Sequence, residues 1–430
     1  MKRRSFIGSI GALTGGLILG NTGLSLAGKP DYKNALKYAI DEESFWKTVR
    51  QQFVFPDDYI YLNTGGIGAL PSFVMNHVQK STFEDERHPS PGHDHRKWDE
   101  VKEICTGLLG PGVKMEEIAL VSTATEGINI ILNGLPLERG DEVITTTHEH
   151  PALHIPLLSR MQRDGIKIKT FEPDLESAQG NVERISDLIT RRTRLVFISH
   201  VTCTTGQNFP LKEIGELTKD KGLWFALDAA QAAAQMPMDV KNWNVDFYTF
   251  SGHKWTLGPK RTGVLYVRED LLDTLRPITV GAYSDGGYSI NDMTLKFHAT
   301  AQRYEYATQN APLFYGLGKA AEFVQTIGLN KIWEHNQKLA EKFCSGLKDI
   351  PGIEILSPQE KKYRTAMITF RSTVKAHSEV SAHLSRNSIR TRGVGEAGLN
   401  GIRVSFHVYN NEEEVDKILA EISNVCSNGG

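Results

Sequence analysis

The chain has 430 residues, of which 40% are hydrophobic and 23% are charged, and this length is sufficient for two domains with buried cores. Its 49 basic and 51 acidic side chains give a formal net charge of −2. No excess of cations is available to displace the counterions of a nucleic acid, so we expect no nucleic-acid partner.

The first element of the chain has the pattern of an export signal. Residues 1–27 combine a basic start, a glycine-diluted apolar stretch and a small-residue ending at Ser25–Ala27. The Arg3-Arg4 pair resembles a twin-arginine signal, although a Sec signal with an incidental arginine pair is the alternative. The sequence therefore predicts a periplasmic protein that meets the twin-arginine export machinery. It predicts no stable membrane anchor after cleavage, because glycines and polar residues interrupt the apolar run.

Three further regions follow the signal. We expect an N-terminal helical segment at 28–58, a large domain at 59–311 and a small C-terminal domain at 312–430. In the large domain, helical patterns alternate with short apolar runs, which is typical of an α/β fold with a mostly parallel sheet. These expected strands lie at 60–62, 117–122, 141–147, 167–171, 194–200, 223–228, 245–250 and 263–267.

The C-terminal region has the pattern of a smaller α+β unit. A long helical stretch is expected at 312–347, followed by strands at 366–372 and 401–406. The four cysteines have no CxxC spacing, so the sequence assigns no disulfide. A loop with His88, His93 and His95 fits no zinc pattern, and we expect no metal.

Polar residues follow two of the expected strands. Residues 122–125 leave a strand and enter a helix, where hydroxyls and free backbone N–H groups form an anion site suited to a phosphate. The alternative is an ordinary threonine N-cap with Glu126 in the first turn. His148 and His150 follow the next strand, either as structural histidines or as a ring stacked over a planar heterocycle.

An aspartate and a lysine follow two later strands. Asp228 ends an apolar run, where it is either a helix N-cap or a carboxylate that pairs with a protonated ring nitrogen. Lys254 follows the next run, and burial there would favour the neutral, nucleophilic amine over a solvated charge. A lysine Schiff base with a carboxylate partner for a pyridinium nitrogen is what pyridoxal phosphate (PLP) requires. Gln231 would lie near a phenolic oxygen, with Ser251 and Thr125 near the phosphate.

Six stretches carry a resemblance to a known family: "STATEGIN", "EHPALHIP", "ISHVTCTTGQNFPL", "LDAAQ", "SGHKWTLGPKRTGVLYV" and "IRVSFHVYNNEEEVDKI". Together they resemble class V, fold-type I PLP-dependent enzymes over roughly residues 58–425. Cysteine desulfurases, isopenicillin N epimerase and related aminotransferases and lyases belong to this class. The resemblance implies a mostly parallel seven-stranded sheet flanked by helices, with a smaller C-terminal α+β domain.

The resemblance also implies roles for individual residues. Lys254 would form the Schiff base, Asp228 would pair with the pyridine nitrogen, and His150 would stack on the ring. Gln231 would lie near the 3′-oxygen, and the phosphate would be held by Ala124, Thr125, Ser251 and His253.

A second group of implied residues concerns the substrate and the partner subunit. Arg403 would clamp the carboxylate of a small amino-acid-like substrate, with Asn63 beside it. Thr308 would reach the phosphate across a homodimer interface. Ala307 stands where the family usually has a glycine, so the conformation of this loop is open.

The absence of a cysteine shortly before Arg403 narrows the range of expected reactions. Some desulfurases place a reactive cysteine shortly before the carboxylate arginine, but residues 390–403 contain none. We interpret Cys203 as a pocket-wall residue rather than a nucleophile. The sequence favours an aminotransferase-type or isopenicillin N epimerase-like enzyme acting on the amino group of an amino acid or peptide-derived metabolite. A PLP-dependent C–S (beta) lyase, or a decarboxylating or tailoring enzyme, is the alternative. A non-catalytic PLP-fold binding protein is disfavoured because Lys254, Asp228 and Arg403 are all present.

Overall fold

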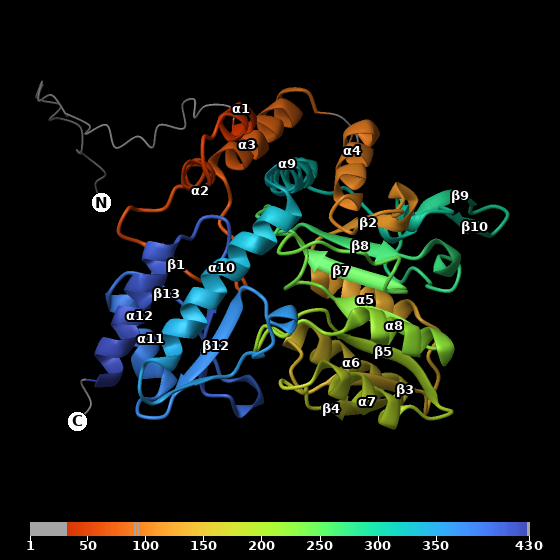
Figure 1. Cartoon of the computed structure of the whole chain (residues 1–430). Coiled ribbons are helices and arrows are strands. Elements are labelled where there is room, and N and C mark those ends of the chain that lie inside the picture. Colours follow the sequence, from red (N-terminus) through yellow and green to blue (C-terminus); the bar gives the residue numbers. More distant parts are fainter. Residues whose placement is uncertain (1–31, 90–91, 93, 428–430) are drawn as a thin grey trace, which may run out of the picture.

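The computed structural model describes residues 32–89, 92 and 94–427, and Figure 1 shows them as a large and a small unit packed together. The expected signal at 1–27 lies outside the described residues. In the part of the chain that is described, no helix is long and apolar enough to cross a membrane.

A seven-stranded sheet forms the centre of the large unit, in the order β2-β8-β7-β6-β5-β3-β4. All neighbouring strands are parallel except the two pairs that involve β8. The seven apolar runs after residue 100 that we expected to be strands are confirmed. Their bounds are β2 (Ile118–Val121), β3 (Glu142–Thr146), β4 (Lys167–Phe171), β5 (Thr193–Ser199), β6 (Trp224–Asp228), β7 (Phe247–Ser251) and β8 (Gly263–Val267).

The central strands are buried on both faces. In β6, Phe225 and Leu227 join one hydrophobic cluster and Ala226 joins a second one, because successive side chains point to opposite sides of a strand. This double burial is why the strands read as continuous apolar runs. The helices that pack on the sheet are α4 (His95–Thr106), α5 (Ala124–Gly134), α6 (Pro151–Asp164), α7 (Ala178–Leu188) and α8 (Leu211–Asp220). Helix α9 (Ala311–Ile327) packs on α4, and α3 (Ser72–Arg87) packs on α9.

The small unit is built on a four-stranded antiparallel sheet in the order β11-β12-β15-β14. The two strands expected here are confirmed as β12 and β15. The elements are β11 (Ile353–Ile355), β12 (Met367–Ser372), β14 (Arg392–Val394), β15 (Gly401–Ser405), α10 (Leu329–Lys348), α11 (His377–Arg386) and α12 (Glu412–Ser427). The stretch expected as one helix at 312–347 is two helices, α9 and α10. They are separated by Gly328, whose φ of 96° suits glycine.

The N-terminal segment packs against both units, and the Tyr32 ring stacks on Phe73 of α3 with centroids 4.6 Å apart. Helices α1 (Tyr32–Lys37) and α2 (Glu42–Arg50) precede β1 (Ile60–Tyr61), which pairs in parallel with β13 (Ile389–Arg390). The Trp46 ring stacks on His335 of α10 with centroids 3.8 Å apart. The strand expected at 60–62 therefore exists, but it joins the C-terminal part of the chain. A hairpin of β9 (Asp285–Ser289) and β10 (Thr294–Phe297) projects from the large unit (Figure 1).

Candidate active site

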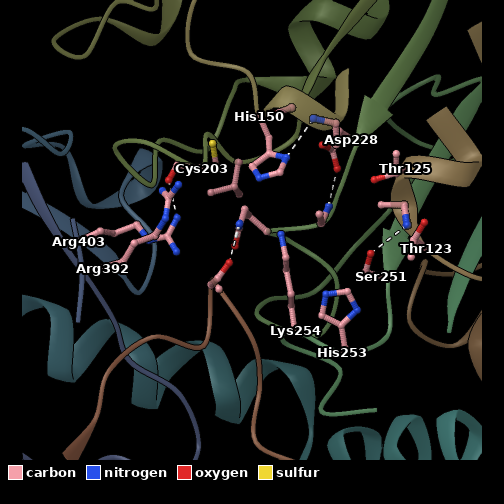
Figure 2. A pocket seen from close by; sticks show the side chains of 18 residues that line it. Thr123, Thr125, His150, Cys203, Asp228, Ser251, His253, Lys254, Arg392 and Arg403 are labelled. Carbon is pink, nitrogen blue, oxygen red and sulfur yellow. Dashed lines mark hydrogen bonds between the residues drawn. The ribbon is translucent and has the colours of Figure 1, made fainter. Parts of the chain in front are cut away.

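A cavity of about 810 Å³, including its open mouth, lies at the carboxyl ends of β5, β6 and β7. Figure 2 shows side chains from the large unit on one side of it and two arginines of the small unit on the other. The carboxyl edge of such a sheet is where α/β proteins bind ligands. The lining residues are Gly65, Gly66, Thr123, Ala124, Thr125, His150, Ala152, Ser199, Val201, Cys203, Asp228, Ala230, Gln231, Ser251, His253, Lys254, Arg392 and Arg403.

Lys254 lies in the turn that follows β7. Its side chain is open to the cavity and otherwise surrounded by protein, and this desolvation lowers the pKa of its amine. Arg403 lowers the pKa further, whereas Asp228 opposes the shift. A Cβ on Gly68 would lie 2.0 Å from the carbonyl oxygen of Lys254, so this close approach of two loops requires glycine. The lowered pKa favours a nucleophilic amine.

Asp228 is the last residue of β6 and is 4% exposed. One carboxylate oxygen accepts a 2.9 Å hydrogen bond from the backbone N–H of Ala230. Burial raises the pKa of this carboxyl, and Lys254 opposes that shift. A buried carboxylate with so few donors is stabilised by a cation placed in the cavity.

His150 caps the N-terminus of α6, with Pro151 at the first helical position. Its Nδ1 accepts a 3.1 Å hydrogen bond from the Ala152 N–H, which places the ring proton on Nε2. Burial, followed by the charge of Lys254, lowers the pKa of His150 to about 4. The cavity wall therefore presents a neutral imidazole ring. His148 does not line the cavity; its Nδ1 is 2.8 Å from Thr204 Oγ1, so it is a structural histidine.

The turn into α5 forms one end of the cavity. Thr123 caps the helix by accepting from the Glu126 N–H, and the Ala124 N–H donates 2.9 Å to Ser251 Oγ. The side chain of His253 lies nearby, and its buried Nδ1 has no hydrogen-bond partner among the described residues. A helix N-terminus with a neighbouring hydroxyl and an unpartnered ring nitrogen is suited to an anion.

Arg403 of β15 is 1% exposed and faces the cavity from the small unit. It donates 2.6 Å to the Cys203 carbonyl and 3.4 Å to Asn63 Oδ1. Its Nε is buried and unpartnered within the described chain. Burial, followed by the charge of Arg392, lowers its pKa to about 10. Asn63 accepts a hydrogen bond from Arg403 but is not among the lining residues.

Of two further residues predicted to bind the cofactor, one lines the cavity and the other does not. Gln231 lines the cavity, donates 2.9 Å to the Gly65 carbonyl and accepts 3.0 Å from the Trp255 indole. Thr308 is outside the described lining, and its expected role across a homodimer interface stays a prediction. Ala307, which precedes it, has a φ of 56°, the left-handed conformation for which glycine is usual.

Sequence reasoning missed two charged residues. Arg392 of β14 lines the cavity, and its strand of three residues is too short to show a pattern. Glu149 is buried next to His150 and accepts from Thr146 Oγ1 (2.8 Å) and from the backbone N–H (3.0 Å) and Oγ of Ser199. Burial raises the pKa of Glu149 to about 7. The sequence signal that could have identified Glu149 is its position between His148 and His150, directly after an expected strand.

All four cysteines lie within the described residues and carry free thiols. Cys203 lines the cavity, but burial raises the pKa of its thiol to about 11. Burial likewise raises the pKa of Cys105 to about 12 and of Cys344 to about 11. None of these three is a ready nucleophile at neutral pH. Among the residues that the structure describes, no cluster of histidine, cysteine and carboxylate side chains could hold a metal ion.

A profile of the aminotransferase class-V family matches residues 96–418. The chain is 27% identical over 404 residues to a probable cysteine desulfurase of Methanothermobacter thermautotrophicus, a match that covers 89% of this chain and 98% of that protein. The apo structure of a cysteine desulfurase from Thermococcus onnurineus NA1 is similar, with 27% identity, a TM-score of 0.80, and 89% and 98% of the two chains covered.

C-DES, a cystine C–S lyase, is a further structural relative. Its complex with the reaction product cysteine persulfide has 25% identity and a TM-score of 0.78, with 86% of this chain and 98% of that one covered. A lysine-to-alanine mutant of C-DES contains glycine covalently linked to the PLP cofactor; it has 25% identity and a TM-score of 0.79, covering 87% and 99% of the chains.

The fold is that of the fold-type I PLP-dependent enzymes, as expected, with its mainly parallel seven-stranded sheet and small α+β unit. The chain belongs to the aminotransferase class-V family, since the match spans well over half of its 430 residues. The relatives favour the C–S lyase alternative over the transamination or epimerisation that the sequence put first.

Proposed function

We propose that the chain is a PLP-dependent C–S lyase that acts on a cysteine- or cystine-type amino acid and releases the sulfur product from the site. The observation that carries this proposal is the content of the cavity. It combines Lys254, Asp228 and Arg403 with a single cysteine, Cys203, whose thiol pKa is raised by burial. The curated and structural relatives act on cysteine or cystine, which supports this substrate class.

The side chains of the cavity fit the phosphate, the ring nitrogen, the ring face and the aldehyde carbon of PLP. The α5 turn, Ser251 and the unpartnered Nδ1 of His253 would hold the phosphate. Buried Asp228 would meet the pyridinium nitrogen, and the flat, neutral ring of His150 would lie against the pyridine ring. The amine of Lys254 would provide the covalent attachment.

PLP, when bound, supplies an electrophilic carbon for an amine and a conjugated ring that takes up electron density from the α-carbon of the substrate. Arg403 would bind the substrate carboxylate and so orient the α-carbon over the site. The lowered pKa of Lys254 suits it to accept the α-proton as a general base. Asp228 would hold its negative charge beside the ring nitrogen throughout.

The proposed reaction is a β-elimination. The α-proton moves to the Lys254 amine, the Cβ–S bond breaks, and its electron pair leaves with the sulfur. Hydrolysis of the remaining three-carbon fragment yields pyruvate and ammonium. From cystine, the sulfur product is cysteine persulfide, and no oxidant or reductant is consumed.

A panel of amino acids tests this reaction against the alternatives. We expect pyruvate from L-cysteine or L-cystine without an added keto acid. A requirement for a keto-acid acceptor would mark transamination, and α-deuterium exchange with formation of the D-isomer would mark epimerisation. Either outcome in place of pyruvate release would refute the proposal.

We further propose that the mature enzyme acts in the periplasm as a homodimer. The twin-arginine pattern of residues 1–27 motivates the location, and the family resemblance of the Thr308 loop motivates the dimer. Cell fractionation and light scattering test these two points. Protein confined to the cytoplasm would refute export, and a monomeric active enzyme would refute the dimer.

A further inference from the structure

Arg392 and Arg403 form an unusual pair of cations in the small unit. They are directly opposite each other on the antiparallel strands β14 and β15, so their side chains leave the same face. Both line the cavity, and Figure 2 shows the two guanidinium groups side by side. Like charges in this arrangement are destabilising, which is tolerable where an anionic ligand joins them.

The two arginines lie at different depths. Arg403 is 1% exposed, whereas the Arg392 side chain is 28% exposed and therefore nearer the mouth. Arg392 forms an ion pair with Glu396, whose side chain is 26% exposed. The Nη1 of Arg392 is buried without a hydrogen-bond partner in the described part of the chain. A guanidinium and a carboxylate therefore lie side by side toward the mouth, and one nitrogen of that guanidinium makes no hydrogen bond within the described chain.

Glu396 lies in a short turn between β14 and β15. Glu396 begins a short 3₁₀ turn (Glu396–Gly398) in which Ala397 and Gly398 have φ values of 52° and 69°. Two backbone hydrogen bonds close this turn, from Gly398 N–H to the Gly395 carbonyl and from Leu399 N–H to the Glu396 carbonyl, both 3.2 Å. The ion pair with Arg392 places the carboxylate of Glu396 at the rim of the cavity.

We propose that Arg392 and Glu396 form a subsite for the far end of the substrate, and that this subsite is complementary to a second amino-acid zwitterion. The carboxylate of that zwitterion binds Arg392, and its ammonium group binds Glu396. This inference rests on the proposed function, since it takes Arg403 and the cofactor to hold the reacting amino-acid group. A lone distal carboxylate would meet the negative charge of Glu396, whereas a zwitterion satisfies both partners. The substrate class is an amino-acid disulfide such as cystine.

Four disulfides of L-cysteine, which differ only in their second half, separate the contribution of the distal carboxylate from that of the distal ammonium group. The second half is cysteine (zwitterion), cysteamine (ammonium), 3-mercaptopropionate (carboxylate) or methanethiol (neutral). We expect kcat/KM for cystine to exceed that for the methyl disulfide by roughly tenfold or more, as for one or two charge-assisted contacts. Equal values for all four disulfides would overturn the subsite but leave the C–S lyase intact.

Two variants test the separate roles of the Arg392 and Glu396 charges in binding the distal half of the substrate. Arg392→Gln is expected to remove the advantage conferred by a distal carboxylate, and Glu396→Gln the advantage conferred by a distal ammonium. The readout is the ratio of kcat/KM between each disulfide and the methyl disulfide, so a general loss of activity does not affect it. Arg371→Gln is the matched control: Arg371 pairs with Glu354 in the same sheet and is not among the cavity-lining residues described. Ratios that change equally in all three variants would contradict the proposal.

Binding without turnover gives an independent readout. Isothermal titration of the four disulfides into the PLP-loaded Lys254→Ala protein is expected to rank cystine first. Glu396→Gln in that background should weaken the cystine and cysteamine disulfides by roughly tenfold relative to the other two. If none of the four is cleaved by the native enzyme, the proposed function fails. The same binding order would then support the subsite, and an equal order would overturn it.

Discussion

Asp228 is the last residue of β6 and Lys254 follows the end of the adjacent parallel strand β7, and each opposes the pKa shift that burial imposes on the other. Desolvation raises the pKa of the Asp228 carboxyl and lowers that of the Lys254 amine. Both shifts disfavour the charged form, so the interaction of the two groups limits rather than removes the cost of placing them together.

Lys254 is predicted to be the point of covalent attachment. Borohydride reduction of the PLP-loaded protein, followed by peptide mass spectrometry, should place a pyridoxyl group on the peptide that contains Lys254. The Lys254→Ala protein should carry no such group and should lose turnover by at least about a thousandfold. Lys260→Ala, at an exposed lysine six residues on, is the control. A pyridoxyl group on another lysine of the native protein would contradict this assignment.

Asp228→Asn is predicted to lower kcat/KM by roughly 10²–10³, because the amide cannot stabilise a protonated ring nitrogen in a dry site. Steady-state kinetics on L-cystine measures this loss. Asp246→Asn is the matched control: Asp246 is also buried and paired with Arg268, but it precedes β7 rather than lining the cavity. That control should lower Tm and leave kcat nearly unchanged. Equal kinetic effects in the two variants would show that Asp228 has no special role.

Glu149 is predicted to make stability depend on pH. Its pKa in the folded chain is about 7, above the ordinary value of 4.5, so the folded state binds more protons than the unfolded state between these values. Its contribution therefore falls as pH rises from about 4.5 to 7, by up to about 3 kcal/mol.

Glu149→Gln removes this titration. The difference in Tm between the Gln variant and the native enzyme should grow in favour of the variant from pH 5 to pH 8. Thermal unfolding of the holoenzyme at several pH values measures it. A difference that stays constant with pH would show that Glu149 is ionised throughout this range.

Cys203→Ala is predicted to keep kcat within about threefold of the native value, because a thiol with a raised pKa takes no part as a nucleophile. Intact-protein mass spectrometry during turnover should detect no added sulfur on the native chain. Cys426→Ala, at the partly exposed cysteine outside the cavity, serves as the control. A sulfur adduct on Cys203, with activity lost in its alanine variant, would favour a protein-bound persulfide.

Much of the fold was predictable because the strands are buried on both faces. Runs such as 223–227 are continuously apolar for that reason, and parallel strands place the residues at their carboxyl ends along one edge of the sheet. This logic brought together Asp228, Ser251, Lys254 and the turn into α5. It did not require any knowledge of the small unit.

Long-range pairing accounts for what the sequence did not reveal. Arg392 reaches the cavity only because β14 pairs with β15 and sets it opposite Arg403. Strand β1 was expected from the sequence, but its partner β13 lies more than three hundred residues away, so no local pattern identifies the pairing. The break between α9 and α10 was in principle readable, since Gly328 interrupts the helical pattern there.

The stoichiometry of products from L-cystine tests the central claim most directly. The native PLP-loaded enzyme, without added keto acid, is predicted to form one pyruvate and one ammonium for each cystine consumed, with cysteine persulfide released into solution. Alanine as the amino-acid product, with sulfur retained on the protein, would contradict the account and identify desulfurase chemistry instead.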